Sequence, residues 1–214
     1  MEFIPTKILP ALSLRGIRIY VGRGAGLILK VFTLLGVRTI FAMPDPVNAQ
    51  LIAAARSARR KTAAINGGVP RLRILEPGCD RAFETIRFSF ESEKPPVLWL
   101  SAGFDGLAVL PALRVALRSR VPLLVVSPSL NSQVPCSTAA ASGHRRLIRH
   151  ANLFEAFCKR RFQIDRLADC QKVFAQAESL AAAEPAGPVH IEIGAALLSR
   201  WTARRLRTAD EPTI

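Results

Sequence analysis

The chain has 214 residues, of which 50% are hydrophobic, 21% are charged and 7% are aromatic. This composition excludes an intrinsically disordered protein, a collagen-like repeat and a small disulfide-stabilised scaffold. The formal net charge is +14, carried by 24 arginines and 6 lysines against 16 acidic residues, but the basic residues are scattered and form no long run.

In chain order, the hydrophobic periodicity predicts alternating helices and strands. Helices are expected over residues 24–35, 48–61, 80–90, 106–119, 147–159 and 167–184, strands over 37–42, 71–75, 96–100, 121–126 and 188–193, and a loop over 127–143. This alternation predicts an α/β protein with three αβα layers around a mostly parallel sheet. Ligands of such sheets bind at the carboxyl ends of strands, so chemistry is expected after Ala42, Leu75, Leu100 and Val126.

The positive charge has two interpretations. It reflects either an arginine-rich background without a dedicated partner or a basic face that meets an acidic protein or an anionic substrate. Nucleic-acid binding is not predicted, because no helix-turn-helix pattern, aromatic platform or zinc motif is found. The longest apolar stretch, residues 25–36, is too short to span a bilayer, so no membrane association is predicted. The four cysteines form no Cys-x-x-Cys pair and are expected to be free thiols of a cytoplasmic protein.

Three short motifs follow one another along the chain. Residues 35–44 read LGVRTIFAMP, residues 116–127 read ALRSRVPLLVVS, and residues 186–193 read AGPVHIEI. In this order the motifs resemble the N-terminal pyrimidine-binding (Pyr) domain of thiamine diphosphate-dependent enzymes of the acetolactate synthase group. The resemblance implies a Pyr domain over residues 21–196, preceded by an N-terminal extension (1–20) and followed by a basic C-terminal tail (197–214).

One residue of this domain is indispensable in the family, a glutamate after the second strand. The resemblance places it at Glu76, between Leu75 and Pro77. A carboxyl group that is hydrogen-bonded to the pyrimidine ring nitrogen favours the imino tautomer of the cofactor. The imino group then removes the thiazolium proton. The alternative interpretation is a glutamate at a helix start, where exposed backbone N–H groups stabilise a negative charge.

Two loops are implied to border the pyrimidine and the substrate. Pro44 and Asn48 lie in the loop after the first strand, Gly78 lies two residues beyond the expected glutamate, and Gly103 and Gly106 lie in the turn after the third strand. Glycine lets a backbone come close to a ligand, although the last two are equally well interpreted as ordinary turn residues.

A second domain of this family binds the cofactor's diphosphate and Mg²⁺ through Gly-Asp-Gly and a later Asn. The chain contains no Gly-Asp-Gly, so no metal ligand is expected in it. It resembles the α subunit of split enzymes, such as two-subunit sulfopyruvate and phosphonopyruvate decarboxylases. The implied function is therefore that of one subunit of a heteromeric thiamine diphosphate-dependent 2-oxo acid decarboxylase or carboligase. Its partner, a separate diphosphate-binding (PP-domain) subunit, would hold most of the thiamine diphosphate and the Mg²⁺.

Departures from the family pattern support a second hypothesis. Leu75 and Pro77 stand where the family has His and Gln, and Phe104 and Asp105 replace small residues of the third-strand turn. The alternative function is that of a catalytically degenerate Pyr-domain homologue, which acts as a scaffold or regulatory partner.

The remaining candidates have ordinary interpretations. Residues 22–26, GRGAG, lack the Lys-Ser/Thr of a phosphate-binding loop and are expected to form a helix-start turn. His144 and His150 lie among arginines and are expected to be solvated, with contact to an anionic substrate as the alternative. His190 lies inside a predicted strand and is expected to be a core or sheet-edge residue.

Overall fold

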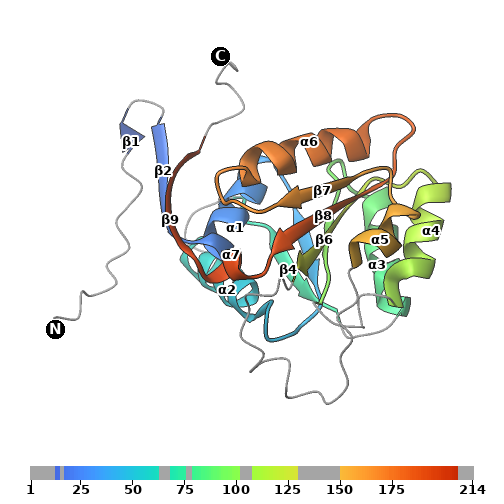
Figure 1. Ribbon diagram of the computed structural model, residues 1–214, viewed down its shortest axis with the longest axis horizontal. Coiled ribbons are helices and arrows are strands. Elements are labelled where there is room, and N and C mark those ends of the chain that lie inside the picture. Colours follow the sequence, from blue (N-terminus) through green and yellow to red (C-terminus); the bar gives the residue numbers. More distant parts are fainter. Residues whose placement is uncertain are drawn as a thin grey trace.

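A six-stranded parallel sheet forms the centre of the computed structural model (Figure 1). The structure describes residues 13–14, 17–62, 68–75, 79–101, 108–129 and 150–206. The strands of this sheet are β3 (Thr39–Ala42), β4 (Arg71–Ile74), β5 (Val97–Trp99), β6 (Leu123–Ser129), β7 (Arg161–Ile164) and β8 (Pro188–Gly194). They lie in the order β4-β3-β5-β6-β8-β7, and every neighbouring pair is parallel. The predicted α/β class is thus confirmed.

Helices cover both faces of this sheet (Figure 1). One face packs against α1 (Gly24–Leu34), α2 (Ala49–Thr62) and α6 (Cys170–Ala182), and the other packs against α3 (Cys79–Phe90), α4 (Leu110–Arg118) and α5 (His150–Glu155). Side chains alternate between the two faces along each strand, so β5 sends Trp99 to the first core and Leu98 to the second. The result is the αβα layering that the alternation predicted.

Aromatic packing holds the first layer to the sheet. Phe32 of α1 lies edge-on to Trp99 of β5 and to Phe174 of α6, with ring centroids 6.5 and 4.7 Å away. All three side chains are fully buried. Edge-to-face geometry adds to the free energy already gained from burying the rings.

Two parts of the sheet differ from the prediction. β6 continues to Ser129, into residues predicted as loop, because it pairs with β8 along its whole length. β7 was not predicted, because only two of its four residues, Phe162 and Ile164, are apolar.

A second, three-stranded sheet was also not predicted. It consists of β1 (Ser13–Leu14), β2 (Ile17–Arg23) and β9 (Trp201–Leu206), paired antiparallel, and α7 (Ala196–Ser199) leads into β9. β2 and β9 extend beside the helical body in Figure 1. β2 begins in the segment interpreted as an N-terminal extension, and β9 lies in the segment interpreted as a C-terminal tail. Their pairing joins regions that are far apart in the sequence.

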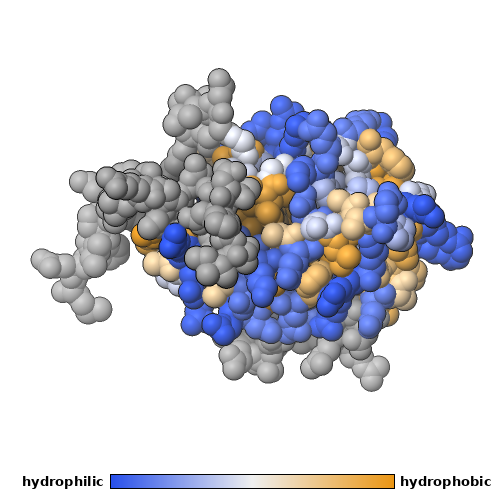
Figure 2. Space-filling view, turned by 90° about the horizontal axis from the view of Figure 1, so that it is seen from above, coloured by the Kyte–Doolittle hydropathy of each residue, from blue (hydrophilic) through white to orange (hydrophobic). Residues whose placement is uncertain are grey.

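The outer surface mixes polar and apolar side chains. Seen from above in Figure 2, hydrophilic residues are spread over this face, with apolar residues between them. Among the helices that the structure describes, none combines the length and the apolar character needed to cross a bilayer.

Candidate functional site

The carboxyl ends of three neighbouring strands, β4, β3 and β5, meet at one edge of the sheet. The register pairs Ala42 of β3 with Ile74 on one side and with Trp99 on the other. From β3 the chain passes outward to β4 and then crosses back to β5, so the direction of the connections reverses between β3 and β5. Parallel α/β sheets bind their ligands at such a switch point.

Each strand at this switch point leads directly into a segment that the resemblance selected. Pro44 and Asn48 follow β3 and are described; the other predicted site residues, Glu76, Gly78, Gly103 and Gly106, lie outside the described residues. Leu75, which immediately precedes the expected glutamate, is 2% exposed and donates its N–H to the Ala42 carbonyl at 2.9 Å. It extends β4 at the edge that bears the switch point.

Asn48 joins the ends of β3 and β5. Its side-chain Nδ2 donates to the carbonyl oxygens of Met43 and Leu100, each at 2.9 Å, and its Oδ1 accepts from Trp99 Nε1 at 2.8 Å. The side chain is 0% exposed. Both amide hydrogens therefore serve the protein itself, and Asn48 holds the two strand ends in register at the switch point.

Pro44 lies on the open side of the same edge. A hollow of about 460 Å³ lies between α2 and the ends of β3 and β4, and its lining includes Pro44, Ile52, Arg56 and Ile74. Asp45 also lines it and accepts a hydrogen bond from the Asn48 backbone N–H at 2.6 Å. The hollow combines an apolar wall with one cationic and one anionic side chain, beside the strand that precedes Glu76.

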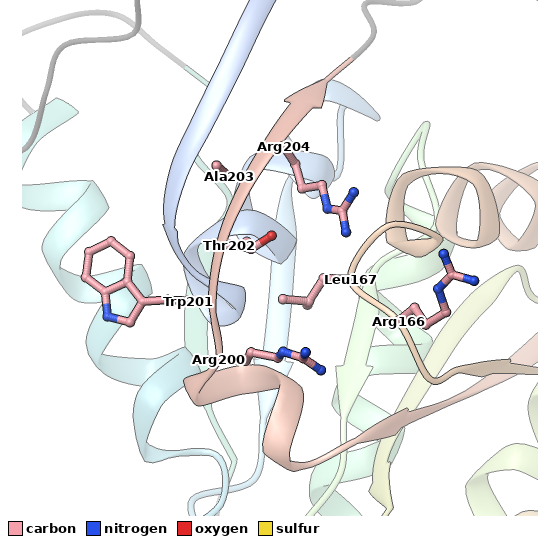
Figure 3. Close-up of a pocket in the computed structure, with 7 residues that line it drawn as sticks. All are labelled: Arg166, Leu167, Arg200, Trp201, Thr202, Ala203 and Arg204. Carbon is pink, nitrogen blue, oxygen red and sulfur yellow. The ribbon is translucent and has the colours of Figure 1, made fainter.

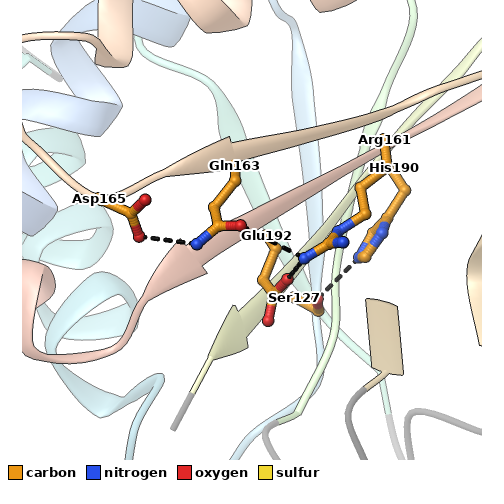
Figure 4. Close-up of polar contacts among 6 residues, drawn as sticks. All are labelled: Ser127, Arg161, Gln163, Asp165, His190 and Glu192. Atoms are coloured by element: carbon orange, nitrogen blue, oxygen red, sulfur yellow. Dashed lines mark hydrogen bonds and ion pairs between the residues drawn. The ribbon is translucent and has the colours of Figure 1, made fainter. Parts of the chain in front are cut away.

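A row of polar side chains crosses the far half of the sheet, on the face covered by α5 (Figure 4). Ser127 of β6 hydrogen-bonds His190 of β8 at 2.8 Å, and Arg161 of β7 pairs with Glu192 of β8. Farther along β7, Gln163 donates to Asp165 at 2.9 Å. Sequence reasoning did not find this row; the alternation of polar and apolar residues along β8 was the available signal.

The side chains of this polar row form contacts between neighbouring strands. Ser127 and His190 are 1% and 0% exposed, and the His190 ring packs edge-on to Phe154 of α5 with centroids 4.9 Å apart. The prediction of a core histidine is confirmed. The Ser127–His190 pair joins β6 to β8, and the ion pair between Arg161 and Glu192 joins β7 to β8.

The glycines before α1 are explained by packing. A Cβ atom at Gly22 would lie 2.6 Å from the Tyr20 hydroxyl oxygen, and one at Gly26 would lie 2.1 Å from it. The Tyr20 side chain therefore packs against both glycines and leaves no room for a larger residue. The Gly24 N–H donates to the Arg200 carbonyl at 2.8 Å. The interpretation of residues 22–26 as a helix-start turn is therefore favoured over a phosphate-binding loop.

Cys158 and Cys170 are buried thiols of low reactivity. Burial raises the pKa of Cys158 to about 12 and, with a further contribution from Asp169, that of Cys170 to about 12. Thiols with such values stay protonated at neutral pH and react slowly. His144 lies outside the described residues, and His150 is the first residue of α5. Within the described ranges, no group of three His, Cys, Asp or Glu side chains is arranged to hold a metal ion.

Comparison with known proteins gives no assignment. No family model matches the chain, and no curated protein matches it.

Proposed function

We propose that the chain is the pyrimidine-binding subunit of a heteromeric thiamine diphosphate-dependent 2-oxo acid decarboxylase or carboligase. The observation that carries this proposal is topological. The segments containing Asn48, Glu76 and Gly103, which the resemblance selected from sequence alone, follow three adjacent strands whose carboxyl ends share one edge. Parallel α/β sheets bind their ligands at such a switch point, which supports the grouping of these segments into one site.

The chain's own residues have distinct roles in this proposal. Glu76 would hold a proton between its carboxyl group and the pyrimidine ring of the cofactor. Pro44 and the neighbouring hollow would border the ring, whereas Asn48 would fix the loop ends through its buried hydrogen bonds. When bound, thiamine diphosphate supplies the carbanion that attacks a 2-oxo acid. The partner subunit would hold the diphosphate and Mg²⁺.

The test begins with the chain purified from its own cells together with whatever binds it. Mass spectrometry of the complex should identify a partner with Gly-Asp-Gly and a later Asn, and should detect thiamine diphosphate. In that complex, Glu76→Gln should lower turnover of a 2-oxo acid by at least about 100-fold, because a positioned proton-transfer group contributes roughly that much.

Glu93→Gln is the matched control. Glu93 forms a surface ion pair with Arg38 at 2.7 Å, with side chains 80% and 67% exposed, so its neutralisation should leave turnover unchanged. Full turnover in Glu76→Gln would contradict the proposal.

The non-catalytic alternative has one structural observation in its favour. Leu75 stands where the family has a histidine, and its apolar side chain is buried, so it presents no polar group to a ligand. An intact complex that contains no thiamine diphosphate would favour a scaffold or regulatory subunit over the enzyme.

A further inference from the structure

Three arginines surround a hollow between the β9 segment and the loop that follows β7 (Figure 3). Arg166 belongs to the loop between β7 and α6, and Arg200 and Arg204 belong to the segment that enters and forms β9. The hollow has a volume of about 460 Å³. In Figure 3 the guanidinium groups of Arg200 and Arg204 extend from the β9 side toward the loop that carries Arg166.

The two arginines of the β9 segment lie on the face of the strand that points toward the body. Side chains alternate along a strand, so Arg200, Thr202, Arg204 and Leu206 share one face. Leu206 is 3% exposed and belongs to the first core, which identifies this face as the inner one. Arg200 and Arg204 are nevertheless exposed, so their guanidinium groups are accessible to a ligand from the solvent.

Acidic neighbours do not explain this arrangement. Among the described residues, neither Arg200 nor Arg204 forms an ion pair. Arg166 reaches Asp169 only at 4.0 Å, and both side chains are more than half exposed, so this contact contributes little. Three like charges around one hollow repel one another, and an anion that enters the hollow removes this repulsion.

The start of α6 carries charges of both signs, because, in addition to burial, the Asp169 carboxylate raises the pKa of Cys170 and Arg204 opposes that rise. The helix begins at Cys170, and its N-cap residue, Asp169, makes no side-chain capping hydrogen bond. The positive charge of Arg204 reaches the Cys170 thiol and opposes the rise in its pKa, so this arginine lies close to the helix start. The positive end of the helix dipole favours a negative charge in the same place.

We infer that this hollow is a binding site for the phosphate or diphosphate group of a small molecule. Guanidinium groups bind phosphate oxygens through paired, charge-assisted hydrogen bonds, and arginines on two sides of the hollow can contact different oxygens of one group. The volume lies within the usual range for small-molecule sites. None of the residues that line this hollow belongs to the segments proposed to bind the pyrimidine, so this inference does not depend on the function proposed for Glu76.

The experiment is calorimetric titration of the full chain with pyrophosphate near physiological salt. The wild-type chain should bind, and Arg200→Gln/Arg204→Gln should weaken binding by about tenfold or more, because each lost guanidinium removes charge-assisted hydrogen bonds. Arg166→Gln should weaken binding as well, since it removes the contact from the other side of the hollow.

Arg114→Gln/Arg118→Gln provides the matched control. These two exposed arginines lie one turn apart on α4, and their replacement removes the same charge from another part of the surface. Binding by this variant should change by less than about twofold. Equal weakening in both double variants would overturn the inference, as would the absence of pyrophosphate binding. Thermal unfolding of each variant verifies that it is folded.

Discussion

The two sheets of this protein place their side chains in opposite ways. Apart from its edge strand β4, where Ile74 is 41% exposed, the six-stranded sheet buries its apolar residues on both faces, and even its polar residues Ser127 and His190 are paired inside. In the three-stranded sheet, Ile19, Val21 and Trp201 are 42%, 55% and 61% exposed, while Arg200 and Arg204 line a hollow beside the loop after β7. Burial of apolar surface therefore accounts for the first sheet. It does not account for the second sheet, whose apolar side chains are largely exposed.

The largest expected effect comes from the aromatic cluster of the body. Phe32→Ala should lower the free energy of unfolding by about 3–5 kcal/mol, because it removes a fully buried ring that contacts Trp99 and Phe174. Urea denaturation would measure this loss. Phe32→Leu retains most of the volume and should cost less than half as much. If Phe32→Ala cost under about 1 kcal/mol, burial would not explain the body.

A smaller loss is expected at the switch point. Asn48→Ala should lower the free energy of unfolding by about 2–3 kcal/mol, because it leaves the buried Trp99 Nε1 without its acceptor and removes both donors to the strand ends. The loss should appear in the chain without any ligand. Unchanged stability of the free chain, together with weaker cofactor binding, would instead make Asn48 a ligand contact.

The smallest effect is expected on the exposed face of the second sheet. Trp201→Ser should change the free energy of unfolding by no more than about 0.5 kcal/mol, because the indole is mostly exposed already. The same urea denaturation measures it, with Phe32→Ala as the aromatic counterpart in the body. A loss comparable with that of Phe32→Ala would remove the contrast between the two sheets.

Much of the body could be predicted because its signals are local. The spacing of apolar residues marks α1 and α6, and the unbroken apolar run in β6 marks a strand covered on both faces. β7 could not be predicted, since its four residues carry too little pattern. β9 was missed for a different reason: its partner, β2, lies at the other end of the described chain, and its alternation contradicts the rule that apolar residues face inward.

The candidate site could be predicted only as separate segments. Residues after β3, β4 and β5 could be selected by motif, but their adjacency depends on the strand order, which the sequence does not state. The role of Asn48 depends on Trp99, 51 residues away. The arginine hollow could not be predicted, because Arg166, Arg200 and Arg204 belong to a positive charge that is scattered along the sequence, and only the fold of the β9 segment brings them together.

The pairing of β2 with β9 has a consequence for synthesis on the ribosome. β2 is translated early, and its hydrogen-bonding partner emerges only after all six strands of the central sheet. Until then one edge of β2 remains unpaired, and strand edges with apolar residues are prone to associate with other chains. The second sheet therefore forms late, and slow translation before residue 201 would lengthen the period in which the nascent chain is most prone to aggregate.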